Sequence, residues 1–220
     1  MKSEFFYRHE RWLNLLLRCE IPWFHEWLLN RVYDQDFYAE MAPAKAASAR
    51  AFAQVVAANM SFQSLFDIGC GSGVFLAEFH RLGKDVAGCE ASRDAVTLAS
   101  KDFPVFVADA TRPIPIDRRH DLVLCIEVAE HIGHRHSRQL VENCAHLGAQ
   151  VLFTAAPPGQ KGIGHINLHA REFWQELFRR EGFVLDAPGT ERIREQLRQQ
   201  QVLAWLYNNL MIFVPAHAKP

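Results

Sequence analysis

Apolar and polar positions follow two different periods on either side of a glycine-rich turn at residues 69–73. The run before it, Leu65–Ile68, is short enough for a buried strand, and apolar residues from Val74 onward recur at helical spacing. Glycine has no Cβ, so the backbone of such a turn can approach a ligand closely, and the following helix directs unpaired N–H groups toward it. This order of elements favours binding of a ligand with a polar or negative group.

Beyond this unit, strand-like and helix-like segments alternate toward the end of the chain. Further strands are predicted at Asp85–Cys89, Val105–Val107, Asp121–Ile126, Gln150–Thr154, Val184–Asp186 and Leu210–Val214. Helices are predicted from the N-cap Ser92 to about Ser100, at Ser137–Leu147, at Ala170–Glu181 and around Glu191–Leu206. The fourth strand is almost wholly apolar, as expected at the centre of a parallel sheet. The alternation predicts an α/β fold.

The first 60 residues differ from this pattern because they are predicted to be helical and aromatic. Apolar side chains share one helix face, which continues past a proline: Trp12, Leu13, Leu16, Leu17, Trp23, Phe24, Trp27 and Leu28. A polar break is predicted at Asp34–Tyr38 and a second helix at about Ala44–Asn59. Basic residues are not concentrated opposite the apolar face, which favours a lid packed on the main domain over a membrane-surface helix. We expect a lid at residues 1–60 and a main domain at 61–220; contact with a partner or a second copy through these helices stays an alternative.

Composition narrows the class of protein. A length of 220 residues suits one domain with at most a small appendage, and the net charge of −1 argues against a nucleic-acid partner. The cysteines form no Cys-x-x-Cys pair and are expected to be small buried residues in a reducing compartment: Cys19, Cys70, Cys89, Cys125 and Cys144. No secretory signal and no run of membrane-spanning length is recognised, so we expect a cytoplasmic protein.

The spacing of the glycines indicates which ligand the turn binds. They occupy the first, third and fifth positions from Gly69, whereas a dinucleotide fingerprint needs the sixth position, which is Val74. A P-loop is excluded because no Gly-Lys-Ser/Thr follows. With Asp67 two residues earlier, the pattern Asp-x-Gly-x-Gly-x-Gly resembles the first motif of class I S-adenosylmethionine (SAM) methyltransferases. The alternative is a plain strand-to-helix turn of an α/β protein.

Two acidic residues follow the next strands at spacings that suit a bound nucleoside. Glu90 lies nineteen residues beyond Gly71, at the end of the second strand, where a carboxylate can accept both ribose hydroxyls. Asp109 follows the third strand, where it is placed to meet the adenine amino group while the Ala110 N–H reaches a ring nitrogen. The predicted cofactor-binding residues are Asp67, Gly69, Cys70, Gly71, Gly73, Glu90, Ala91, Asp109, Ala110 and Glu127.

Taken in order, these residues resemble the class I SAM-dependent methyltransferases over about residues 60–215. The resemblance implies a Rossmann-like fold with a mostly parallel seven-stranded sheet, helices on both faces, and SAM as cofactor. A narrower likeness to bacterial methyltransferases associated with glycan assembly rests on Tyr33–Tyr38, Cys125–His131, Phe153–Asn167 and Trp205–Leu210. It implies O-methylation of a hydroxyl on a sugar, a glycan precursor or another polar small molecule.

A hydroxyl acceptor needs a base or a metal, because a neutral hydroxyl is a poor nucleophile. His131 and His165 follow the two central strands that should flank the methyl group, and an imidazole titrates near neutrality. His165 lies in a Pro- and Gly-rich loop, Ala155–His169, that leaves a central strand where ligands bind in open α/β sheets. We prefer His165 to His131 as the base because the glycines around it let the loop close over the acceptor.

A metal site is the sharper alternative. Glu127, Glu130 and His131, with His165 from the later loop, resemble the Mg²⁺ or Mn²⁺ site of small-RNA 3′-terminal 2′-O-methyltransferases and of ubiquinone-pathway O-methyltransferases. Two carboxylates and an imidazole can hold such a cation, which would lower the pKa of an acceptor hydroxyl. The same sequence pattern also occurs without metal, with Glu127 near the cofactor and Glu130 starting a helix. We favour the metal-free interpretation.

Two other functions stay open. An RNA ribose 2′-O-methyltransferase shares the metal motif, but the chain has no basic stretch for phosphates. A non-catalytic SAM-binding accessory subunit would keep Asp67, Glu90 and Asp109 without needing His165. Acceptor-dependent product formation would exclude the accessory subunit, and a salt-sensitive RNA complex would favour the RNA enzyme.

Overall fold

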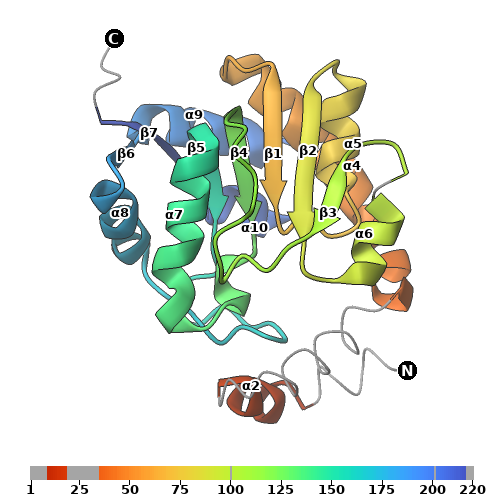
Figure 1. The fold of residues 1–220 in the computed structure, drawn as a ribbon, viewed down its shortest axis with the longest axis vertical. Coiled ribbons are helices and arrows are strands. Elements are labelled where there is room, and N and C mark those ends of the chain that lie inside the picture. Colours follow the sequence, from red (N-terminus) through yellow and green to blue (C-terminus); the bar gives the residue numbers. More distant parts are fainter. Residues whose placement is uncertain (1–8, 19–34, 100, 201, 217–220) are drawn as a thin grey trace.

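The computed structural model describes residues 9–18, 35–99, 101–200 and 202–216, which form one seven-stranded sheet flanked by helices (Figure 1). The strand order is β3-β2-β1-β4-β5-β7-β6. The strands are β1 (Ser64–Ile68), β2 (Asp85–Glu90), β3 (Val105–Val107), β4 (His120–Ile126), β5 (Gly148–Thr154), β6 (Phe183–Leu185) and β7 (Met211–Pro215). β7 runs antiparallel to both of its neighbours, and every other pairing is parallel. The predicted Rossmann-like α/β fold with a mostly parallel sheet is confirmed.

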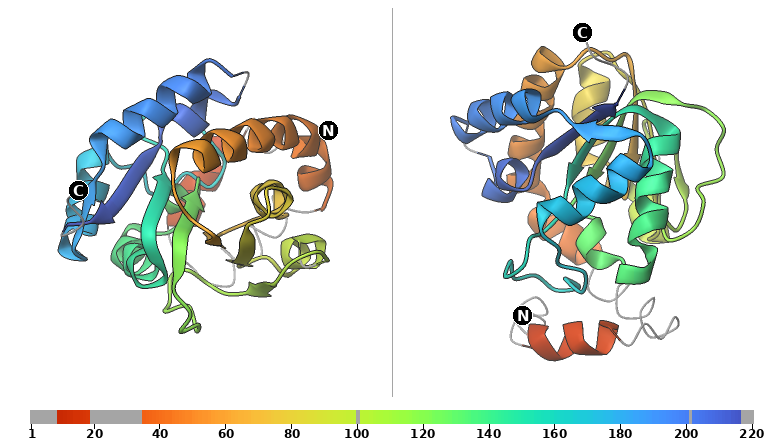
Figure 2. Two further views of the ribbon diagram at one scale, coloured as in Figure 1. Left: turned by 90° about the horizontal axis from the view of Figure 1, so that it is seen from above. Right: turned by 90° about the vertical axis from the view of Figure 1, so that its left-hand side faces the viewer.

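Helices cover both faces of the sheet (Figure 2). They are α2 (Glu10–Arg18), α4 (Gln35–Asn59), α5 (Val74–Arg81), α6 (Arg93–Ala99), α7 (Ser137–Leu147), α8 (Arg171–Arg180), α9 (Ala187–Arg198) and α10 (Ala204–Asn208). One hydrophobic cluster joins α4, α5, α9 and α10 to the sheet, and a second joins α7 and α8 to its other face. The core therefore has two apolar layers, and the ends of the strands are left for the site.

The end of the predicted N-terminal extension packs on the sheet domain. On α4, Phe52 is fully buried and its ring makes edge contacts with Phe75 and Phe79, at centroid distances of 5.2 Å and 6.5 Å. On α2, Leu17 is buried, whereas Trp12 and Leu16 are 69% and 47% exposed. The apolar face predicted there is thus only partly covered. Trp23, Phe24, Trp27 and Leu28 lie outside the described residues, and the boundary at residue 60 stays a prediction.

Two predictions about the helices are wrong. The polar break at Asp34–Tyr38 is absent from the described part, because α4 already begins at Gln35 and continues through Pro43. The single polar helix around Glu191–Leu206 is instead α9 followed by α10. α9 begins early because the Asp186 carboxylate, assigned from sequence to a strand end, accepts a hydrogen bond from Gly189 N as its N-cap.

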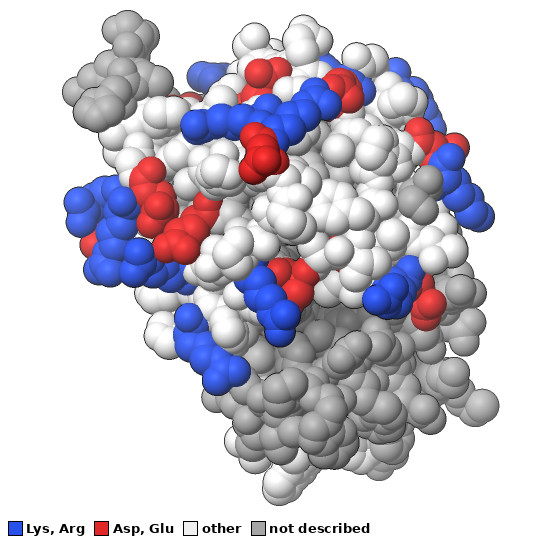
Figure 3. Space-filling view, viewed as in Figure 1, with Lys and Arg blue, Asp and Glu red and all other residues white. Residues whose placement is uncertain are grey.

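The cysteine and charge predictions can be compared with the structure. Cys70, Cys89, Cys125 and Cys144 are buried free thiols, as expected, and Cys19 lies outside the described residues. On the face shown in Figure 3, Lys and Arg lie among Asp and Glu and do not gather in one patch. No helix in the described part of the chain is long and apolar enough to cross a membrane.

Candidate active site

The predicted site residues meet at one edge of the sheet, at the carboxyl ends of its parallel strands. The glycine turn follows β1, Glu90 ends β2, and Asp109 comes two residues after β3. Glu127 directly follows β4, and the loop of residues 155–170 follows β5. Because parallel strands end at the same edge, residues far apart in the sequence are brought together there.

The glycine turn has a backbone that other residues rarely adopt. Gly69, Gly71 and Gly73 have φ angles of 75°, 55° and 79°. An added Cβ on Gly69 would also lie 2.5 Å from Cγ2 of Val128, and one on Gly73 would lie 3.0 Å from Cβ of Ala99. The turn therefore requires glycine for its conformation and for its close approach to the segments beside it.

Glu90 connects this turn to the start of α6. One carboxylate oxygen accepts a hydrogen bond from Gly71 N at 2.9 Å, and the other accepts one from Ser92 N at 3.0 Å. A carboxylate has about four acceptor positions, so each oxygen can still accept from a ribose hydroxyl. Nearby, Asp67 is 2% exposed, and its burial, together with the charge of Glu90, raises the pKa of the Asp67 carboxyl well above its usual range.

The segment after β3 is held next to Glu90. The Ala108 N–H donates to the Glu90 carbonyl at 3.0 Å, and the Asp109 carboxylate accepts from Thr111 N at 2.9 Å. Ala110 follows directly, and Ala91 follows Glu90. The residues predicted to contact the ribose and the adenine are thus neighbours in space. This glycine turn with adjacent carboxylates fits an adenosyl group.

Glu127 is engaged by amide side chains. It has a φ of 53°, and its N–H donates to Oγ1 of Thr154 at 2.8 Å. Its carboxylate accepts from Asn209 Nδ2 at 2.9 Å and from Gln160 Nε2 at 3.2 Å, and Asn209 also donates to the Gln160 side chain at 3.0 Å. Sequence reasoning missed Thr154, Gln160 and Asn209 as site residues, although each lies in or beside a segment that carried the narrower resemblance.

Glu130, His131 and His165 form a cluster whose potential ligand atoms all lie within 4.8 Å of one another. Glu130 is fully buried, and neither of its carboxylate oxygens has a hydrogen-bond partner among the described residues. Burial and then the neighbouring Glu127 raise the pKa of Glu130 well above its usual range. Glu127, predicted as a fourth ligand, is not part of this cluster, and its carboxylate accepts hydrogen bonds from Gln160 and Asn209. The cluster fits a cation that would balance the buried carboxylate.

The loop after β5 fixes the orientation of His165. Its ring nitrogen Nδ1 lies 3.3 Å from the Gln160 carbonyl, an acceptor that selects the tautomer with the proton on Nδ1 and a lone pair on Nε2. Burial lowers the pKa of the His165 imidazole. The loop continues into Asn167, which is buried and donates to the Ala129 carbonyl at 3.0 Å and to Oγ of Ser137 at 2.9 Å. The imidazole is therefore held on a loop that is anchored at both ends.

Helix α2 contacts this loop through its polar side (Figure 1). Asn14 donates to the Gly162 carbonyl at 2.9 Å and accepts from Gly164 N at 2.7 Å. Glu10 accepts from Gly162 N at 3.0 Å. The N-terminal helix thus lies over the segment that carries His165.

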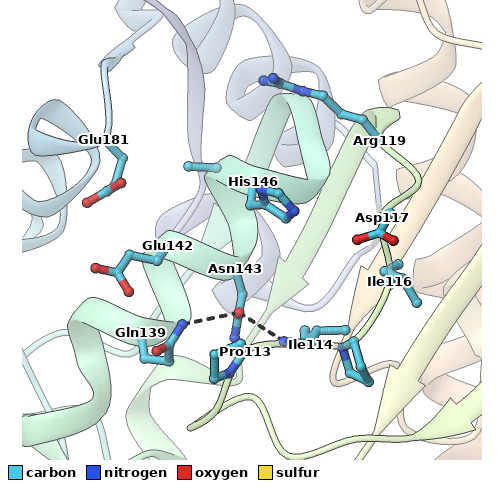
Figure 4. Close-up of a pocket in the computed structure, with 12 residues that line it drawn as sticks. Pro113, Ile114, Ile116, Asp117, Arg119, Gln139, Glu142, Asn143, His146 and Glu181 are labelled. Carbon is cyan, nitrogen blue, oxygen red and sulfur yellow. Dashed lines mark hydrogen bonds between the residues drawn. The ribbon is translucent and has the colours of Figure 1, made fainter.

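A separate cleft of about 570 Å³ lies between α7 and the segment that leads into β4 (Figure 4). Its lining includes Ile114, Arg119, Asn143 and His146. None of the predicted cofactor, catalytic or metal residues lines it. The candidate active site is therefore the edge of the sheet and not this cleft.

The seven-stranded sheet with its helices is the Rossmann-like fold of class I SAM-dependent methyltransferases, and residues 66–148 match the sequence family described as "Methyltransferase domain". Among curated proteins, the chain is 24% identical over 153 residues to a ubiquinone biosynthesis O-methyltransferase of Proteus mirabilis, covering 66% of this chain and 59% of that protein. It is 26% identical over 160 residues to the mitochondrial enzyme of that name from Candida albicans, covering 67% of this chain and 46% of that one. The chain thus spans about half of the length of these relatives.

Solved structures show the same fold. An amino pentose methyltransferase of calicheamicin biosynthesis from Micromonospora echinaspora, with SAM bound, has a TM-score of 0.63 at 16% identity, covering 81% of this chain and 96% of that one. A sugar N-methyltransferase from a Streptoalloteichus species has a TM-score of 0.61 at 18% identity, covering 81% and 91%. At these identities the likeness establishes the architecture alone.

Proposed function

We propose that this chain is an O-methyltransferase that transfers a methyl group from SAM to a hydroxyl of a sugar, a glycan precursor or another polar small molecule. The observation that carries the proposal is that the glycine turn with Glu90 and the paired imidazoles of His131 and His165 lie at one sheet edge. Relatives named as O-methyltransferases support transfer to a hydroxyl. The sugar acceptor rests on the sequence resemblance, and neighbours named as sugar methyltransferases share the fold.

When bound, SAM supplies an activated methyl group. The chain binds and orients the cofactor and the acceptor, and it removes the proton of the acceptor hydroxyl. Glu90 accepts hydrogen bonds from the ribose, and Asp109 with the Ala110 N–H binds the adenine. The acceptor hydroxyl lies near His165, whose Nε2 accepts its proton while Nδ1 stays bonded to the Gln160 carbonyl. The lowered pKa keeps this imidazole neutral at physiological pH, the form that can accept a proton.

The proposal predicts different effects of two histidine substitutions. His165→Ala should lower turnover at least about 100-fold while the affinity for SAM stays within about twofold, because general bases contribute on this scale. The matched control is His146→Ala, since His146 is exposed on α7 and lines the separate cleft. Both variants are compared by calorimetry with SAM and S-adenosylhomocysteine and by methyl transfer to a panel of sugars and sugar nucleotides.

The outcomes separate the functions considered. SAM binding with transfer to a sugar hydroxyl, lost in His165→Ala, supports the proposal; full activity of that variant removes the base. SAM binding without transfer to any acceptor favours an accessory subunit, for which the exposed Trp12, Leu15 and Leu16 on α2 would be the contact surface. Transfer to RNA alone would favour the ribose enzyme, against which the near-neutral charge argues.

A metal-assisted form of the same reaction is the second candidate, favoured by the unpartnered, fully buried Glu130 carboxylate. Glu130, His131 and His165 would hold the ion, and one carboxylate with two imidazoles suits Mn²⁺ better than Mg²⁺. The ion would lower the pKa of the acceptor hydroxyl.

This second candidate predicts that Mn²⁺ raises the melting temperature of the wild type by several degrees and leaves that of Glu130→Gln unchanged. Gln keeps the shape of the side chain but cannot supply an anionic ligand. Chelator should then stop catalysis and Mn²⁺ should restore it. Equal melting temperatures with and without Mn²⁺, together with activity in chelator, would leave the metal-free base.

A further inference from the structure

Asn143 on α7 is a buried amide, 5% exposed, whose hydrogen-bonding capacity is fully used. Its Nδ2 donates to the carbonyls of Ala110 at 3.0 Å and Arg112 at 2.9 Å. Its Oδ1 accepts from Ile114 N at 3.2 Å and, more weakly, from Gln139 Nε2 at 3.4 Å (Figure 4). One side chain thus binds three alternate backbone positions of the same segment.

These three positions belong to the connection between β3 and β4, which contains no helix or strand in the described residues. Buried backbone groups need hydrogen-bond partners, and the Asn143 amide supplies the hydrogen bonds that a neighbouring strand would otherwise supply. Within the segment, the Asp109 carboxylate accepts from Thr111 N, and the Asp109 carbonyl accepts from Arg112 N at 3.0 Å. Hydrogen bonds inside this turn orient Asp109, and Asn143 holds the same turn from α7.

We infer that Asn143 is a positioning residue for recognition of the adenine base, acting through Asp109 and Ala110. The inference rests on the proposed function, in which those two residues meet the adenine amino group and a ring nitrogen. Because the Ala110 carbonyl is bonded to α7, the Ala110 N–H and the Asp109 carboxylate keep fixed directions. Without Asn143 the turn is no longer bonded to α7, and the site distinguishes less well between an amino and a carbonyl group on the bound base.

Other contacts hold the segment against the domain, so the variants should fold. Ile114 is buried in the second hydrophobic cluster, and the Arg119 guanidinium donates to the Gly148 carbonyl at 2.7 Å. Asn143→Leu keeps a neutral side chain of similar volume and removes all four hydrogen bonds. Asn143→Ser, which is smaller and keeps one donor, is the second variant in case the first does not fold. Gln139→Ala is the matched control on the same helix, because it removes the 3.4 Å contact alone.

The test is calorimetric titration with S-adenosylhomocysteine and with S-inosylhomocysteine, in which a carbonyl oxygen replaces the adenine amino group. We expect the wild type and Gln139→Ala to prefer the adenosyl ligand by at least about tenfold. Asn143→Leu and Asn143→Ser should lose about tenfold in affinity for the adenosyl ligand. They should also lose most of the preference for it over the inosyl ligand, approaching the ratio measured for Asp109→Ala. A merely structural role would weaken both ligands equally and keep their ratio.

Two results would overturn the inference in distinguishable ways. A wild type that binds neither ligand removes the proposed function and the inference with it. A wild type that binds with a clear preference, alongside folded Asn143 variants that keep the same ratio, removes the inference alone.

Discussion

The glycine at position 69 shows how one residue combines two constraints. Its φ of 75° disfavours any side chain, and an added Cβ would meet Val128 at 2.5 Å. Gly83 has nearly the same φ, 77°, but an added Cβ there meets nothing within 4 Å. Comparing Gly69 with Gly83 separates the cost of an unusual backbone conformation from the cost of a steric clash of the added Cβ.

Gly69→Ala should therefore lower the affinity for S-adenosylhomocysteine by more than about tenfold, because the turn must shift to accommodate the methyl group. Gly83→Ala should lose a similar amount of stability, about 1 kcal/mol, because of left-handed strain, and its affinity should not change. Calorimetry and thermal unfolding of both variants measure the two quantities. Equal losses of affinity would show that the turn acts through stability and not through the site.

The convergence of the predicted cofactor residues at one sheet edge could be foreseen from sequence, because each follows its own strand at a short, recognisable spacing. Gln160 and Asn209 could not, because they reach Glu127 across 33 and 82 positions of the chain and carry no local pattern. The pairing of Glu130 with His131 and His165 was accessible only through a resemblance. Glu127, the fourth expected ligand, is not among the three clustered residues, and its carboxylate accepts hydrogen bonds from those two amides.

At the scale of elements, the strands and most helices were predicted within a few residues because hydrophobic periodicity marks them directly. The errors arose where local signals are ambiguous. An Asp after two apolar residues suits both a strand end and an N-cap, and only the contact of Asp186 with Gly189 N decides between them. Likewise, the packing of α2 on a loop about 150 residues away has no signature in sequence.

The contact between α2 and the loop predicts a defined phenotype. Asn14→Ala removes two hydrogen bonds to the loop and should raise KM for the acceptor several-fold while leaving the affinity for SAM unchanged, because Glu90 and the glycine turn are not involved. Amide hydrogen exchange of residues 162–166 should become faster. Leu15→Ala is the control on the exposed side of the helix. If exchange does not change, α2 does not hold the loop.

At the scale of the whole molecule, stability depends on a link between β1 and β4 at their amino ends. The Asp121 carboxylate accepts from Gln63 N and Ser64 N, each at 2.8 Å. These N–H groups lower the pKa of Asp121 below its usual 3.8. A carboxyl with a lowered pKa in the folded state stabilises the protein above the pKa of the unfolded chain, and this contribution is lost as the pH falls through the folded-state value.

Asp121→Asn should therefore lower the free energy of unfolding at pH 7 by about 1 kcal/mol, discounted for solvent screening, or about 2–4 °C in melting temperature. The difference from the wild type should stay constant between pH 7 and 5 and shrink below about pH 4. Asp117→Asn, an exposed change of the same charge, is the control for net charge. A difference that does not depend on pH would contradict the role of the ionised carboxylate.

The contacts of α2 with the loop have a consequence for how such a protein can change its acceptor. Asn14 and Glu10 bind the N–H and carbonyl groups of Gly162 and the N–H of Gly164, which are backbone groups shared by every sequence. Closure over the loop is therefore independent of the identity of its outward-facing side chains. Substitutions at those positions can accumulate without breaking the hydrogen bonds between α2 and the loop. For the proposed function, this would let acceptor preference change while the backbone contacts around the loop stay the same.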